Sequence, residues 1–175
     1  MTAQKIKTRD MTFIAVFAAV LAVLSQLAIP MPSGVPITLQ TFALALIGYT
    51  LGAKRGAIAV LVYLLLGAVG VPVFANFKAG AAALLGPTGG FLWAFWLAAL
   101  FCGLKRDAGP LPALASGFLG LLVLYAAGVF QFILLTGNGL VEAVLMCVAP
   151  FVIKDVLSIV LGYFLAQQIR RRLPL

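Results

Sequence analysis

The stretch Pro150-Phe-Val-Ile-Lys-Asp-Val-Leu-Ser-Ile-Val-Leu-Gly-Tyr-Phe-Leu-Ala166 is apolar over the length of a membrane helix, yet it holds the adjacent charges Lys154 and Asp155. An ionised side chain near the bilayer centre costs at least ~2.5–3.5 kcal/mol, so it normally faces the protein interior or a wet cavity. We therefore expect a polar partner opposite Asp155. The alternative is a Lys-Asp pair near a helix end, whose side chains reach the lipid headgroups.

The composition of the whole chain indicates a membrane protein. Of 175 residues, 64% are hydrophobic and 9% are charged, and the mean hydropathy is +1.19. A soluble domain is about half apolar and a quarter charged. We predict an all-α integral membrane protein with one membrane domain, residues 1–175, and a first helix that is retained, since no Ala-x-Ala cleavage site follows it.

Six membrane-spanning helices can be drawn, because about 20 apolar residues cross a bilayer and fewer suffice where it is thin. They are expected at about 11–29, 37–51, 56–71, 87–104, 111–135 and 150–168. A long external loop, about 72–86, separates the third helix from the fourth. Residues 140–149 are consistent with a short interfacial helix.

The distribution of cations predicts the orientation of these helices. The clusters are Lys5, Lys7 and Arg9; Lys54 and Arg55; Lys105 and Arg106; and Arg170, Arg171 and Arg172. Such clusters mark the cytoplasmic side of a cell-membrane protein, so we predict that both termini are cytoplasmic. The clusters alternate with apolar spans, which makes the net charge of +8 a topology signal and argues against a nucleic-acid partner.

Only Lys78 and Lys154 fall outside the clusters, and in this topology both lie toward the external side, as does Asp155. Irregular external segments above an outer charge pair suggest a binding pocket rather than a pore. The polar groups that could recognise a ligand are Thr38, Gln40, Asn76, Lys78, Tyr125, Gln131, Lys154 and Asp155. For Thr38, Tyr125 and Gln131 the alternative interpretation is a role in packing or in hydrogen bonds to the helix backbone.

The sequence contains no recognisable catalytic set. It has no histidine, no serine with a plausible base and no paired carboxylates in a span, whereas a hydrolase needs a base–nucleophile pair or a metal. We predict no enzyme activity, no metal and no cofactor; Cys102 and Cys147 lack metal-ligand spacing. The segment Gly48-Tyr-Thr-Leu-Gly-Ala-Lys-Arg55 lacks phosphate-loop spacing, so partners would have to supply ATP energy.

Small residues recur at helical spacing in the first span. Ala15 and Ala19 are four residues apart, as are Ala18 and Ala22. Such pairs let a second helix approach closely in lipid. From the spacing alone, contact with a partner and packing within the chain are equally good interpretations.

Several motifs in order resemble the BioY family, the biotin-binding S components of energy-coupling factor (ECF) transporters. They are Val35-Pro-Ile-Thr-Leu-Gln-Thr41, Leu51-Gly-Ala-Lys-Arg-Gly56, Gly70-Val-Pro-Val-Phe-Ala75, Leu85-Gly-Pro-Thr-Gly-Gly-Phe91 and Pro150-Phe through Asp155. The resemblance implies six helices, high-affinity biotin binding from outside, and a complex with a transmembrane coupling subunit and two ATPase subunits. It favours Ala15 and Ala19 as the docking face for the coupling subunit.

The resemblance also implies a biotin site, with one departure. We predict the site from Gln40, Asn76, Lys78, Tyr125, Lys154 and Asp155. Asp155 matches a family Asp and Asn76 a polar family position, and both would pair with the ureido group of biotin. However, Ser158 stands where the family has a Lys, and Lys154 replaces a Gly. Either Lys78 or Lys154 is left to hold the carboxylate, beneath a lid of residues 31–36 and 76–79. The alternative function is a secondary carrier or channel for another solute.

Overall fold

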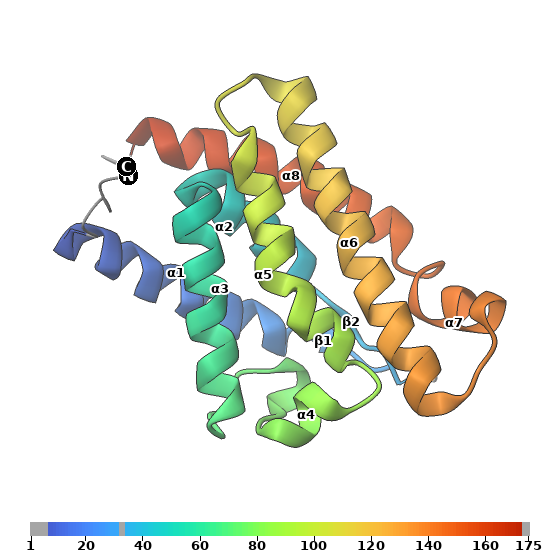
Figure 1. The fold of residues 1–175 in the computed structure, drawn as a ribbon. Helices are drawn as coiled ribbons and strands as arrows, with labels where there is room; N and C mark the ends of the chain where they lie inside the picture. The colour runs from blue at the N-terminus through green and yellow to red at the C-terminus, as the bar shows by residue number, and fades with distance from the viewer. Residues whose placement is uncertain (1–6, 32–33, 173–175) are drawn as a thin grey trace, which may run out of the picture.

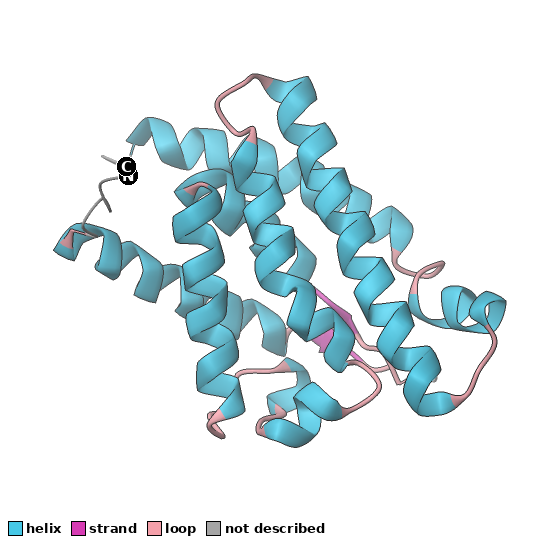
Figure 2. Ribbon diagram, viewed as in Figure 1, coloured by secondary structure: helices cyan, strands magenta, loops and turns pink. Residues whose placement is uncertain are grey.

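The computed structural model describes residues 7–31 and 34–172, which form a bundle of helices with one small antiparallel ribbon (Figures 1 and 2). The first half of the chain contains α1 (Thr8–Gln26), β1 (Ala28–Ile29), β2 (Ile37–Thr38), α2 (Gln40–Leu51), α3 (Ala53–Ala68), the 3-10 turn η1 (Ala75–Phe77) and α4 (Ala81–Leu85). The second half contains α5 (Gly89–Leu104), α6 (Pro110–Thr136), α7 (Leu140–Cys147) and α8 (Val152–Arg172).

The helical fold class and most helix positions match the expectation. Two differences lie at the end of the first helix and the start of the second, where α1 stops at Gln26 and α2 starts at Gln40. Between them the strands pair with Ala28 opposite Thr38 and Ile29 opposite Ile37. A third difference is the 72–86 connection, which contains η1 and α4 and is thus partly ordered structure.

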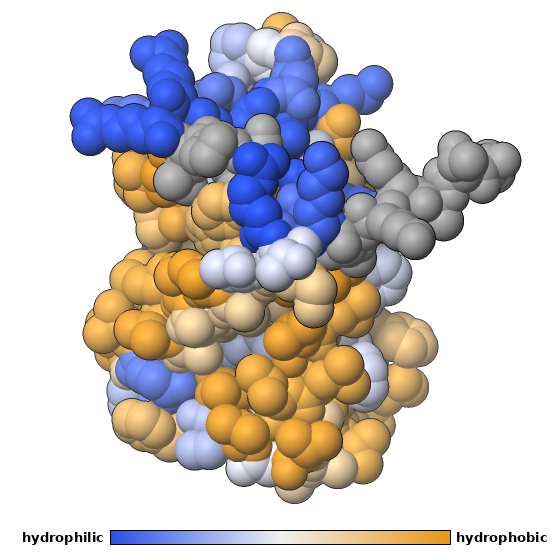
Figure 3. Space-filling model, turned by 90° about the vertical axis from the view of Figure 1, so that its left-hand side faces the viewer, coloured by the Kyte–Doolittle hydropathy of each residue, from blue (hydrophilic) through white to orange (hydrophobic). Residues whose placement is uncertain are grey.

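Three helices are long and apolar enough to cross a membrane by length and composition: α1, α6 and α8. α2 and α5 are apolar but shorter. The face shown in Figure 3 is hydrophobic over most of its area and hydrophilic at one end. The structure therefore describes a protein with several apolar helices, of which three alone have full membrane-spanning length within the described residues.

The core of the bundle surrounds α2. This helix contacts α1, α3, α5 and α8, and all of its residues except Phe42 are buried. A helix that is apolar on every side lies in a protein core or in a membrane, and here four other helices pack around it. α2 is thus the central helix against which the other elements are placed.

Glycine permits two of the closest helix approaches. A Cβ added to Gly48 of α2 would collide with the Ala99 carbonyl oxygen of α5, and one at Gly90 of α5 would collide with the Ala127 carbonyl oxygen of α6. Small residues at such contacts let backbones approach closely in lipid. The positions of α5 and α6 relative to the core therefore depend on these two glycines.

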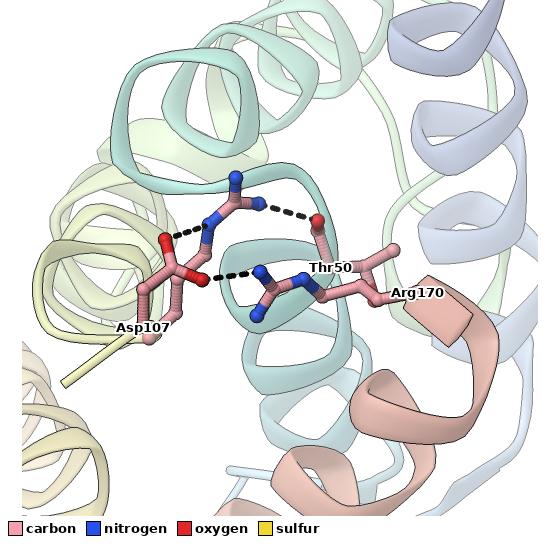
Figure 4. A network of polar contacts seen from close by, with 4 residues as sticks. Thr50, Asp107 and Arg170 are labelled. Carbon is pink, nitrogen blue, oxygen red and sulfur yellow. Dashed lines mark hydrogen bonds and ion pairs between the residues drawn. The ribbon is translucent and has the colours of Figure 1, made fainter. Parts of the chain in front are cut away.

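Charged side chains join several elements at one end of the bundle, here called the basic end. Arg106 donates to the Thr50 carbonyl at 2.6 Å and to Asp107 Oδ2 at 3.3 Å, and Arg170 from α8 pairs with Asp107 Oδ1 (Figure 4). Arg55 of α3 pairs with Asp10 of α1 at 3.3 Å. These contacts connect α2 and α8 with the α5–α6 loop, and α3 with α1.

Candidate functional site

A largely apolar pocket lies at the other end of α2, α5 and α8, here called the pocket end. It holds about 750 Å³ of space, counting its open mouth, which is within the range of small-molecule sites. Its polar lining residues are Thr38, Gln40, Thr41, Lys78, Thr88, Tyr125, Lys154 and Asp155. Its aromatic lining residues are Phe74, Phe91, Phe95, Tyr125 and Phe151. The pocket thus has an apolar body with a few polar groups.

Asp155 is the buried acid of this pocket, with 3% of its surface exposed. It lies in the first turn of α8, where the helix dipole favours a negative charge. Tyr125 of α6 donates to its Oδ2 at 2.7 Å. Its Oδ1 is paired with Lys154 Nζ. An ionised carboxyl group has about four lone-pair sites, so this buried group can still accept an N–H from a ligand.

Lys154 lies on the pocket wall with its ammonium already engaged. Besides the ion pair with Asp155, Nζ donates to the Thr38 carbonyl oxygen at 2.8 Å. This contact fastens the start of α8 to strand β2. The partner expected for Asp155 is therefore present, as both a cation and a tyrosine hydroxyl, and the charge pair lines a pocket.

Gln40 belongs to a chain of hydrogen bonds that runs from the pocket to α1. Its Nε2 donates to Tyr63 Oη of α3 at 3.1 Å, and its Oε1 accepts from Thr38 Oγ1 at 2.9 Å. Tyr63 Oη in turn lies 3.0 Å from Ser25 Oγ near the end of α1. All four residues are buried. Gln40 is thus fixed in one orientation at the pocket wall.

Lys78 and Asn76 lie on a short hairpin, residues 73–78, which we call the pocket hairpin. Phe74 and Lys78 form an antiparallel bridge at its base, and both line the pocket. The Lys78 ammonium has no partner among the described residues. Asn76 is exposed at the tip and is not a lining residue. Of the six predicted site residues, the structure brings together Gln40, Lys78, Tyr125, Lys154 and Asp155, but leaves Asn76 outside.

One polar residue that the sequence suggested lies outside the pocket, and two aromatic lining residues were not predicted. Gln131 donates to the carbonyls of Leu84 and Gly86 at 3.0 and 2.8 Å, outside the pocket. Phe95 and Phe151 line the pocket and were missed. Phe95 follows the lining residue Phe91 by four positions, a spacing that places both on one helix face and offered a signal. In the expected lid over 31–36, positions 32 and 33 lie outside the described residues.

Ala15 and Ala19 are on the exposed side of α1, whereas Ala18 is buried. α1 packs on the bundle through Ile14, Phe17, Ala18 and Leu21. The small-residue pair 15/19 is therefore free of internal packing, and packing within the chain involves the other pair.

Comparison with known proteins gives the family. A BioY family model matches residues 1–175. The chain belongs to the BioY family. The biotin transporter BioY of Thermotoga maritima is 41% identical over 158 residues, which cover 89% of this chain and 92% of that protein. A probable biotin transporter BioY of Pyrococcus horikoshii is 36% identical over 164 residues, covering 94% and 98%.

The fold is similar to that of a solved transporter component. The crystal structure at 2.1 Å of the S-component for biotin from an ECF-type ABC transporter superposes with a TM-score of 0.85 at 26% identity, covering 98% of this chain and 95% of that one. The resemblance to the BioY family that the motifs indicated is thus confirmed over residues 1–175.

Proposed function

We propose that this chain is the substrate-specific component of an ECF-type transporter, and that it binds biotin in the pocket next to Asp155. The observation that carries the proposal is the buried Asp155 carboxylate on the wall of a largely apolar pocket, where Tyr125 and Lys154 hold it in place, in a chain of the BioY family. The ureido N–H groups of biotin suit such an acceptor. The apolar ring and valerate chain suit the aromatic walls.

The carboxylate of biotin is assigned to Lys78. Lys154 already contacts the Thr38 carbonyl and Asp155, and a ligand carboxylate there would have to compete with Asp155. Lys78 is exposed on the pocket hairpin and lines the pocket. Asn76 stays a prediction as the partner of the ureido carbonyl, and requires its side chain to turn inward from the hairpin tip.

The orientation in the membrane is part of the proposal. Ten of the twelve cations fall in the clusters assigned to the cytoplasmic side, which puts the basic end inside and the pocket outside. Six spans then require α2, α3 and α5 to cross in a locally thin region, since they have 12, 16 and 16 residues. A cysteine introduced at position 2 or 174 should resist an impermeant thiol reagent in intact cells, and reaction there would overturn the topology.

Energy for uptake would come from partners, a transmembrane coupling subunit and two ATPase subunits, because no phosphate-binding loop is present in the sequence. The exposed pair Ala15 and Ala19 is the proposed docking face. Ala15→Trp or Ala19→Trp should abolish co-purification with the coupling subunit and leave biotin binding intact. Leu122→Trp, on an exposed position of α6, is the control. Normal complexes from both alanine variants would exclude this face.

The direct test is a biotin titration of the purified protein after endogenous ligand has been removed. We expect a dissociation constant in the nanomolar range, which is about −12 kcal/mol. Thiamin, an unrelated vitamin, is the negative control. No heat and no competition with labelled biotin would reject the proposal. Net uptake should also require the partner subunits; uptake by this chain alone at the full rate would favour a secondary carrier.

A further inference from the structure

We propose that Gln26 is a latch, a positioning residue that holds the pocket hairpin closed and so sets the rate at which ligand leaves. This inference rests on the proposed function and extends it to the control of release. Gln26 is the last residue of α1 and does not line the pocket. α1 contacts η1, and Figure 1 shows its end next to the connection that leads to α4.

The side-chain amide of Gln26 bonds to the backbone of the pocket hairpin. Its Nε2 lies 3.1 Å from the Val73 carbonyl oxygen and 3.2 Å from that of Phe74, and its Oε1 accepts the Phe77 N–H at 3.0 Å. Only one orientation of the amide satisfies both sides, because the flipped group would oppose donor to donor and acceptor to acceptor. One side chain therefore binds both arms of the hairpin.

The backbone of the hairpin tip has an unusual conformation. Asn76 and Phe77 both have left-handed φ angles, of 57° and 56°. Asn adopts this conformation readily, but for a bulky residue such as Phe it is a strained state. The Phe77 side chain is 70% exposed, so its burial does not compensate the strain. The hydrogen bond to Gln26 Oε1 is the contact that turns the Phe77 N–H inward.

The inner side of the hairpin faces the ligand space. Phe74 is 2% exposed, lies edge-on to Tyr63 with ring centroids 5.5 Å apart, and lines the pocket together with Ala75 and Lys78. A hairpin that swings away would remove Phe74 from the wall and Lys78 from the mouth. Loss of the latch should therefore accelerate both entry and release of biotin.

The position of Gln26 on α1 links the pocket hairpin to the proposed docking face. The proposed docking face, Ala15 and Ala19, lies on the same helix, and the adjacent Ser25 contacts Tyr63 in the chain of bonds that reaches Gln40. A tilt of α1 during docking would move Gln26 relative to the hairpin. Docking to the coupling subunit would then favour opening of the pocket.

The test replaces the amide without changing its size. Gln26→Glu keeps the acceptor for Phe77 but turns a carboxylate oxygen toward the two carbonyls. We expect labelled biotin to leave about tenfold faster in a chase experiment, which is about 1.4 kcal/mol, with a similar melting temperature. Gln131→Glu is the matched control, because Gln131 also donates to two backbone carbonyls, those of Leu84 and Gly86, outside the pocket; it should change the release rate by less than about twofold.

A ligand-free readout separates this proposal from the proposed function. Ala75→Cys, made together with Cys147→Ala because Cys147 also lines the pocket, reports access to the hairpin by its reaction rate with a maleimide. Gln26→Glu should raise that rate, and Gln131→Glu should not. An unchanged rate, or equal acceleration of biotin release in both Glu variants with equal loss of thermal stability, would overturn the latch. Absence of biotin binding in the unmutated chain would reject only the proposed function.

Discussion

The two ends of the bundle use charge in opposite ways. At the basic end, Asp107 has 67% of its side chain exposed and is shared by Arg106 and Arg170. At the pocket end, Asp155 is buried, is paired with Lys154 and lines a pocket. Exposed ion pairs contribute at most ~1 kcal/mol, whereas a buried ion pair is costly to desolvate and is weak evidence for a role in stability. The comparison indicates that the basic end serves structure and topology, and that the pocket end keeps binding capacity for a ligand.

The largest effect should come from removing the charge at the pocket end. Asp155→Asn puts an NH₂ or a neutral oxygen where a ligand N–H needs a carboxylate. Hydrogen bonds to charged groups contribute ~1.5–3 kcal/mol, so biotin affinity should fall by about tenfold to a hundredfold. Titration calorimetry of Asp155→Asn and of Asp107→Asn, the matched change at the basic end, checks this. A comparable loss in both variants would remove the distinction between the two ends.

A smaller effect is expected when the neighbour that orients Asp155 is changed. Tyr125→Phe removes the hydroxyl that donates to Asp155 Oδ2 at 2.7 Å but keeps the ring on the pocket wall. A neutral donor to a charged acceptor is lost without loss of the charge, so we expect biotin affinity to fall by about three- to tenfold. Phe118→Leu on the same helix, which does not line the pocket, is the control. An unchanged affinity for Tyr125→Phe would mean that Asp155 needs no orientation by α6.

The smallest effect is expected at the basic end. Burial alone would raise the pKa of Asp107, but the hydrogen bond from Arg170 and the charges of Arg106 and Arg170 outweigh it and hold the pKa below its ordinary value of 3.8. The resulting stability is present above pH 3.8 and is lost as the pH falls through the lower folded-state pKa. Asp107→Asn should therefore lower the free energy of unfolding by at most ~1 kcal/mol at neutral pH.

Thermal melts of Asp107→Asn and the unmutated protein across pH and salt check that expectation. The difference between them should shrink in acid and at high ionic strength, while biotin affinity stays the same. A large destabilisation that persists in high salt would show that the basic end does more than hold loops together.

The sequence was sufficient to predict the helical membrane fold and the pocket-end acid, because apolar runs and an isolated intramembrane charge are local signals. It did not predict the β1–β2 ribbon, whose strands have only two residues each, or the order within 72–86, where Gln26 of α1 binds the pocket hairpin. Gln26 is a clear case. Nothing in its local sequence distinguishes it from any polar helix end, and its partners Val73, Phe74 and Phe77 lie about fifty positions away.

The sequence predicted which polar residues belong to the site, but it could not predict their contacts, because these join residues far apart in the chain. Asp155 and Tyr125 meet across 30 positions, and Lys154 reaches Thr38 across 116. Polarity in an apolar span indicated that these residues matter, but only the fold shows which of them are engaged. Asn76 matched a family position, yet the left-handed backbone at the hairpin tip leaves it exposed.

The central claim is that Asp155 contacts the ligand and is more than the counter-ion of Lys154. The most direct measurement is a side-by-side biotin titration of Asp155→Asn and Lys154→Gln, with the melting temperature of each. We predict a loss of about tenfold to a hundredfold for Asp155→Asn and a much smaller loss for Lys154→Gln. Equal losses of affinity that follow equal losses of thermal stability would contradict this account and leave the two residues as a structural ion pair.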